Sequence, residues 1–168
     1  MNFVEKIPEI APLFEGSNYI DVKTIEGNTS LRQFVASMLS YYPWWVLLLY
    51  RIRSVLVKIL GLVEQQAPEV LPHLQAANVS FAVGDLVTFF TVRLAKEKQY
   101  WVGETPEDKH LSAYFGVFVE PLAVNRNRFH VATIVHYKHW TGPVYFNIIR
   151  PFHHLVVSRM MRAGVADC

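Results

Sequence analysis

Histidine and tyrosine side chains are the groups in this sequence best suited to acid–base chemistry or to holding a polar ligand. His110 and Tyr114 share one face of an expected strand, and His136 lies on the next strand. An imidazole titrates near neutral pH and a phenol donates a hydrogen bond, so these groups could orient a ligand or act as general acid or base. Because alternation does not reveal which face is buried, the alternative is that each histidine is a structural donor or lies on the outer face.

The spacing of the histidines argues against a metal site. His136 and His139 are three residues apart on a strand, so their side chains point to opposite faces. His153 and His154 are adjacent on an expected helix, which separates them by about 100°. The sequence contains no Gly-x-Ser-x-Gly, His-Glu-x-x-His or Gly-x-Gly-x-x-Gly segment, and its only cysteine is Cys168. We therefore expect no metal and no bound cofactor.

Composition predicts one cytoplasmic domain spanning all 168 residues. A single cysteine rules out an intramolecular disulfide, and no signal peptide is visible at the start of the chain. The formal net charge of +2 comes from scattered lysines and arginines, which argues against nucleic-acid binding. Residues 39–63 are apolar, but Arg51, Arg53 and Lys58 interrupt them, so we expect no transmembrane helix.

The first half of the chain predicts one strand followed by two helices. Residues 1–16 resemble a loosely ordered lead-in, and residues 18–26 alternate as a strand does. Thr29 or Ser30 is expected to cap a helix that ends before Pro43, and Pro43 suits the first turn of a second helix. Residues 64–84 form a connection that contains two prolines.

The second helix has an apolar arc that we expect to pack inside the protein. Its members fall on one side at about 100° per residue: Trp45, Leu48, Leu49, Ile52, Leu56, Ile59 and Val63. Val46, Leu47 and Val57 lie among the polar side chains on the other side. We expect these three either to be exposed or to be covered by a second copy of the protein.

The second half of the chain predicts an antiparallel meander and a long final helix. Residues 86–95, 99–104, 109–120 and 128–140 read as four strands joined by short turns. The final helix begins near Pro143 and continues through Pro151, which should kink it. The result is an α+β fold in which a curved antiparallel sheet packs on a long C-terminal helix, with two shorter helices after the first strand.

Several segments resemble an uncharacterised bacterial family, domain of unknown function 2867, within the START-like and Bet v 1-like helix-grip superfamily. The resemblance spans roughly residues 15–162 and is carried by residues 51–62, 108–111, 133–139, 142–145 and 150–157. Gly142-Pro143-Val144-Tyr145, followed by Arg150-Pro151-Phe152-His153, is its most specific part. The resemblance implies the helix-grip fold and transfers no catalytic residue. Some relatives resemble this chain fused to a nucleotide-binding oxidoreductase domain, which here would have to be a separate partner.

These observations favour a protein that binds a small apolar or amphipathic molecule between the sheet and the final helix. The candidate ligand-binding residues are His110, Tyr114, His136, Trp140, Tyr145, Ile149, Phe152 and His153. One alternative is a cyclase, dehydratase or hydrolase that uses His110, Tyr114 or His136 as acid or base. Another is an interaction protein whose second helix forms a homodimer, or docks on an oxidoreductase or a membrane surface.

Overall fold

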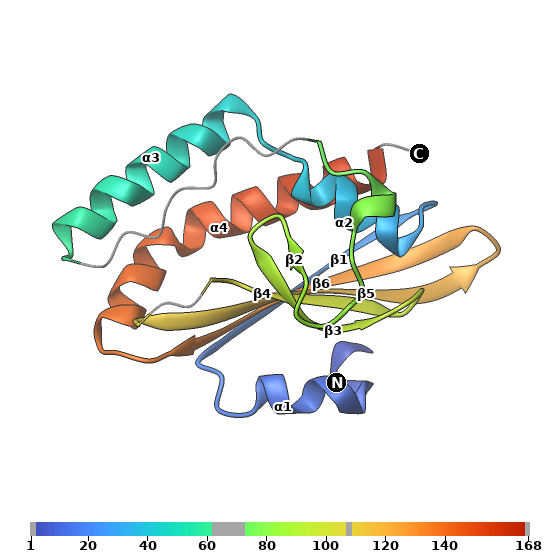
Figure 1. Ribbon diagram of the computed structural model, residues 1–168, viewed down its shortest axis with the longest axis horizontal. Helices are drawn as coiled ribbons and strands as arrows, with labels where there is room; N and C mark the ends of the chain where they lie inside the picture. Colours follow the sequence, from blue (N-terminus) through green and yellow to red (C-terminus); the bar gives the residue numbers. More distant parts are fainter. Residues whose placement is uncertain (1–2, 62–72, 107–108, 167–168) are drawn as a thin grey trace.

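The framework of the molecule is an antiparallel sheet of six strands in the order β1-β6-β5-β4-β3-β2. The computed structural model describes residues 3–61, 73–106 and 109–166. The strands are β1 (Tyr19–Gly27), β2 (Leu86–Val87), β3 (Phe90–Lys96), β4 (Tyr100–Glu104), β5 (Leu111–Ala123) and β6 (Arg126–Tyr137). β1 pairs with β6 at one edge, so the first strand closes the meander that the second half of the chain forms (Figure 1).

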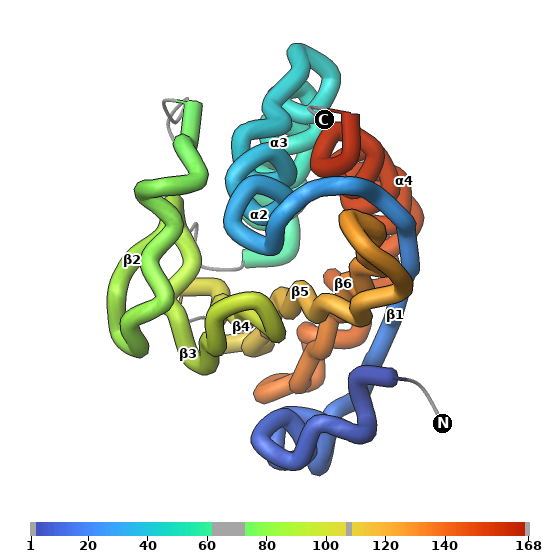
Figure 2. The backbone as a smooth tube through the Cα atoms, turned by 90° about the vertical axis from the view of Figure 1, so that its right-hand side faces the viewer, coloured from blue at the N-terminus to red at the C-terminus, as the bar shows by residue number. Residues whose placement is uncertain are grey.

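Three helices cover one face of this sheet, which we call the helix-covered face. They are α2 (Leu31–Leu39), α3 (Trp44–Ile59) and α4 (Thr141–Ala166). Figures 1 and 2 show them on one side of the sheet, with the N-terminal residues on the other. This arrangement confirms the predicted α+β helix-grip fold, in which two helices follow the first strand and a long helix ends the domain.

The alternation of β5 and β6 produces two separate apolar cores. Phe115 and Val117 of β5 face α2 and α4, where Phe129 of β6 stacks on Phe34 with ring centroids 4.1 Å apart. Successive strand residues point to opposite faces, so Phe118 of β5 instead joins a second cluster on the other side of the sheet. Alternate residues of these strands thus supply apolar side chains to a core on each face of the sheet.

Residues 3–14 of the expected lead-in form short helical turns. Short 3₁₀ helices at Phe3–Lys6 and Pro8–Ile10 precede α1 (Ala11–Phe14). Val4 and Ile10 are fully buried against the second cluster. The prolines that break the helical pattern in the sequence divide this segment into short turns, and each of the two 3₁₀ turns buries an apolar side chain under the sheet.

Close contact between α2 and α4 depends on a glycine. A Cβ atom at Gly164 would lie 2.7 Å from the Phe34 ring and 3.0 Å from Cγ of Met38. The missing side chain lets the two helices approach. The C-terminal half of α4 is therefore held by α2, while its N-terminal half faces α3.

Strand boundaries differ from the prediction where turns lack the usual signals. The expected strand 86–95 is a tight hairpin, because β2 and β3 pair across Thr88 and Phe89, and Thr88 has a φ of 57°. No glycine, proline or asparagine marks this turn. β6 ends at Tyr137, since residues 138–140 lead into α4. Of the expected connection 64–84, only residues 73–84 lie within the described part of the chain, and they include a short 3₁₀ helix at Ala76–Asn78.

Candidate functional site

A cavity of about 360 Å³ lies between the sheet and helices α3 and α4. Most of its wall is apolar. Strands β3, β5 and β6 contribute Phe90, Leu111, Ala113, Phe115 and Val135, and the helices contribute Val46, Leu49, Leu56, Ile149, Val156 and Met160. Small-molecule sites in proteins are concave and mainly apolar, with a few polar groups that fix orientation. The cavity has this character, so its polar groups define what it could hold.

His153 and Thr133 form the polar pair on the sheet side of the cavity. Thr133 Oγ1 and His153 Nε2 lie 3.1 Å apart, in hydrogen-bond contact. Burial in the apolar wall, together with the adjacent His154, lowers the pKa of His153 from the ordinary value of 6.5 to about 4. The His153 imidazole is therefore neutral at neutral pH and can offer a ligand a hydrogen bond but no charge.

Arg53 and Tyr145 form the polar pair on the helix side. Arg53 Nε donates a hydrogen bond to the Tyr145 hydroxyl, and its guanidinium lies 5.9 Å from the centre of the Tyr145 ring. Both residues line the cavity, together with Tyr42 and Tyr50, whose pKa values are raised because the phenols are buried. Arg53 thus places a permanent positive charge beside neutral phenols.

The helix α4 is fixed over the sheet by a second histidine. His154 Nε2 lies 2.9 Å from the Tyr19 hydroxyl, and Lys23 Nζ lies 2.9 Å from His154 Nδ1. Asp21 adds an ion pair to Lys23 at 2.8 Å. These contacts to β1 fix the rotation of α4, and the rotation directs the neighbouring His153 towards the cavity.

A family model described as "Protein of unknown function (DUF2867)" matches residues 13–160. The chain belongs to this family. No curated protein matches it. Among solved structures, a START superfamily protein from Mycobacterium smegmatis is similar, with 12% identity, coverage of 88% of this chain and 97% of that chain, and a TM-score of 0.43.

Two further solved structures are similar at the same level. Truncated norcoclaurine synthase from Thalictrum flavum has 13% identity, covers 89% of this chain and 94% of its own, and gives a TM-score of 0.43. A hypothetical protein from Helicobacter pylori has 12% identity, covers 99% of this chain and 96% of its own, and gives 0.45.

In this family member, four of the eight candidate ligand-binding residues line the cavity. They are Tyr145, Ile149, Phe152 and His153, all on α4. Tyr145 is buried, whereas Phe152 is about half exposed and lies at the cavity's outer rim. Their spacing along one side of α4 brings them together as the sequence predicted. That they bind a ligand stays a prediction.

The other four candidates lie outside the cavity. Tyr114 packs against the second cluster with its ring centroid 5.9 Å from that of His136, and His136 Nε2 donates to the Leu13 carbonyl at 3.0 Å. His110 Nδ1 lies 2.7 Å from Oγ1 of Thr141, the first residue of α4, and Trp140 is exposed. The structural alternative holds for His136, which lies on the sheet face covered by the N-terminal segment, whereas His110 precedes β5 and contacts the first residue of α4. That any of these four residues binds a ligand stays a prediction.

The inward face of α3 also differs from the prediction. Val46 and Val57, expected to be exposed or covered by a second copy, are buried within the chain. Leu48 and Ile59, expected inside, are exposed. Compared with the predicted orientation, α3 is turned about its own axis, so that Tyr50 and Arg53 face inward and form part of the cavity wall. Counting apolar side chains favours the wrong side when the inner face includes polar groups.

The sequence analysis therefore missed Thr133, Arg53 and Tyr50 as cavity residues. Thr133 is two residues from both Val131 and Val135 on β6, so its side chain lies on the same face of the sheet as theirs. The sequence would therefore have placed Thr133 on the cavity side if these two valines had been assigned to the inner face. Nothing in the pattern around Arg53 marks that side chain as inward-facing.

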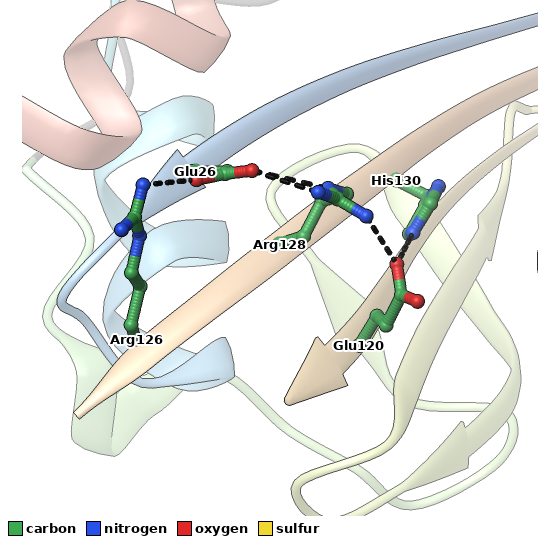
Figure 3. Close-up of polar contacts among 5 residues, drawn as sticks. All are labelled: Glu26, Glu120, Arg126, Arg128 and His130. Atoms are coloured by element: carbon green, nitrogen blue, oxygen red, sulfur yellow. Dashed lines mark hydrogen bonds and ion pairs between the residues drawn. The ribbon is translucent and has the colours of Figure 1, made fainter. Parts of the chain in front are cut away.

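A separate polar cluster lies on the sheet face opposite the helices. Arg128 bridges Glu26 and Glu120 at 2.9 and 3.2 Å, and Glu120 contacts His130 at 2.9 Å (Figure 3). Arg126 pairs with the other oxygen of Glu26 at 2.6 Å. Hydrogen bonds from the arginines lower the pKa of Glu26, and the bond to His130 lowers that of Glu120. This cluster ties β1, β5 and β6 together, and within the described residues no group of three metal-binding side chains forms.

Proposed function

We propose that this protein binds a small apolar or amphipathic molecule in the cavity between the sheet and helices α3 and α4. The observation that carries the proposal is the cavity itself, whose volume of about 360 Å³ is lined by mainly apolar side chains from both layers. Ligand pockets of about 300–1,000 Å³ with few polar groups are typical of small-molecule sites.

The polar groups indicate how such a ligand would be oriented. A neutral polar group of the ligand would lie near His153 and Thr133, where a charge would be poorly solvated. An anionic head group would lie near Arg53, whose guanidinium prefers carboxylate-like partners. The proposed ligand therefore has an apolar body and, where it carries a charge, a negative one.

The alternative, an enzyme that uses His110, Tyr114 or His136 as acid or base, is not supported by the positions of Tyr114 and His136. Tyr114 and His136 lie on the sheet face away from the cavity, so neither can act on a molecule bound there. His153 has a pKa of about 4, far below that of an effective general base at neutral pH.

Native mass spectrometry of the purified full chain tests the proposal, together with titration of the fluorescent amphiphile 1-anilinonaphthalene-8-sulfonate. We expect either a co-purified mass above that of the chain or saturable binding of one probe molecule per chain. The mass of the chain alone, combined with no saturable fluorescence increase, would contradict the proposal.

A further inference from the structure

Helix α3 exposes an apolar stripe to solvent. Trp44, Leu48, Ile52, Val55 and Ile59 are between 46% and 76% exposed. At about 100° per residue they fall within an arc of roughly 80°, so they form one continuous line along the helix. Scattered apolar residues at a surface are ordinary, whereas a contiguous row of large ones marks an interaction site.

Helix α4 has a matching stripe. Val144, Ile148, Phe152 and Leu155 are between 44% and 48% exposed, and their spacing repeats that of the first four residues of the α3 stripe. Ile52 of α3 and Ile148 and Phe152 of α4 are exposed and also line the same cavity. The two stripes therefore converge at the mouth of the cavity, on helices that pack side by side over the sheet (Figures 1 and 2).

The charge of these two helices is of one sign. They hold six of the sixteen lysines and arginines and none of the fourteen acidic residues, which leaves ten cations and fourteen acids for the rest of the chain. Arg51 lies at the edge of the α3 stripe, and Arg159 and Arg162 continue the α4 stripe towards the C-terminus; all three are exposed. An excess of basic charge thus coincides with the apolar stripes.

We propose that this apolar–basic face, formed by the two stripes and these three arginines, docks on an anionic lipid surface. Apolar side chains of surface helices enter the boundary between head groups and acyl chains, and neighbouring basic residues pair with lipid phosphates. Tryptophan favours the same boundary, where Trp44 would lie. No helix among the described residues is long and apolar enough to cross a membrane.

The charge favours lipid over a second copy of the chain. A symmetric dimer through this face would bring two basic surfaces together, because the same patch meets itself across a two-fold axis. Docking on lipid would turn the cavity mouth towards the bilayer. It does not require that the cavity hold a ligand, so the two proposals fail separately.

Co-sedimentation of the full chain with vesicles tests the docking. One set contains phosphatidylcholine alone, and the other contains phosphatidylcholine and phosphatidylglycerol in equal parts. We expect the protein to sediment with the anionic vesicles, to bind the neutral ones at least tenfold more weakly, and to be released by high salt, which screens the arginines.

Two double variants and one matched control identify the face. Val55→Ser with Ile59→Ser removes apolar side chains that do not line the cavity, and Arg51→Glu with Arg162→Glu reverses two charges. Each is expected to weaken binding at least tenfold. Lys6→Glu with Lys96→Glu changes the net charge by the same amount outside α3 and α4, and should weaken binding less than threefold. Circular dichroism confirms that each variant is folded.

Three results would overturn the proposal. One is wild-type protein that stays in the supernatant with anionic vesicles. Another is a control variant that loses as much binding as the arginine variant. The third is a dimer in light scattering that the Val55→Ser and Ile59→Ser changes convert to a monomer, since the face would then be an interface between copies.

Discussion

His153 is held in an environment that favours its neutral form. Its imidazole contacts Thr133 within an otherwise apolar wall, and the neighbouring His154 adds like charge whenever it is protonated. At the scale of single residues, the cavity wall therefore combines the neutral pair of His153 and Thr133 with the cation of Arg53 and its neighbouring phenols. The neutral state of His153 and the charge of Arg53 each lead to one prediction.

The first prediction concerns stability at acidic pH. Because the pKa of His153 is about 4 when folded and ordinary when unfolded, the unfolded chain takes up a proton first as the pH falls. Stability should decline between about pH 6.5 and pH 4, and His153 should account for up to about 3 kcal/mol of that loss. His153→Gln keeps a partner for Thr133 and should remove this part of the slope in urea unfolding.

The comparison of wild type with His153→Gln isolates this effect. Glu26 and Glu120 also have lowered pKa values, but their contribution is lost below the ordinary carboxyl pKa and is common to both proteins. Equal pH slopes between pH 6.5 and pH 4 would show that His153 does not titrate as described.

The second prediction concerns the charge of the ligand. Arg53→Met keeps most of the apolar stem and removes the cation beside Tyr145. A hydrogen bond to a charged group contributes about 1.5–3 kcal/mol, so binding of 1-anilinonaphthalene-8-sulfonate should weaken roughly tenfold or more. N-phenyl-1-naphthylamine has the same rings without the sulfonate and serves as control. An equal loss for both probes would contradict a role for the charge.

At the scale of elements, each face of the sheet has its own cover. The helices enclose the cavity on one face, and the N-terminal segment buries Val4 and Ile10 on the other. The segment is tied to the strands by stacking of Phe3 on His130 at 4.8 Å and by the bond from His136 to Leu13. His136 therefore helps to hold the N-terminal segment on the sheet, which is the structural role that the sequence left open as an alternative.

This role of the N-terminal segment predicts a large effect of Ile10→Ala. Truncating a fully buried isoleucine removes apolar contacts and leaves a cavity, which costs about 2–5 kcal/mol. Chemical denaturation measures the change in the free energy of unfolding. Val124→Ala, at a turn residue that is 91% exposed, is the control and should change it little. A loss below about 1 kcal/mol for Ile10→Ala would indicate a segment that is not packed as described.

At the scale of the whole molecule, sequence patterns predicted the fold better than the site. Strand alternation, the cap at Ser30 and the long apolar α4 are local signals, and they were sufficient for the order of the three long helices and the long strands. They did not separate β2 from β3 or predict the turns before β1. Which sheet face meets the helices depends on packing between distant segments. Whether the side chains of His136 and Arg53 point towards the cavity depends on which face the helices cover. The residues near each of them in the sequence do not determine that direction.

The molecule as a whole is polarised. The helical layer combines the cavity, its mouth and the excess of basic charge, whereas the opposite face carries the N-terminal segment and the ion pairs around Arg128. Both proposed binding surfaces therefore lie on the helical side of the sheet. The proposed ligand binding depends on the cavity.

Filling the cavity tests that claim most directly. Ala113 lines the cavity, while its neighbour Ser112 points to the opposite face of β5. In titrations with 1-anilinonaphthalene-8-sulfonate, Ala113→Phe should weaken binding at least tenfold because the ring occupies the ligand's space, and Ser112→Phe should stay within twofold of wild type. Equal affinities for wild type and both variants would place the probe outside the cavity and contradict the account.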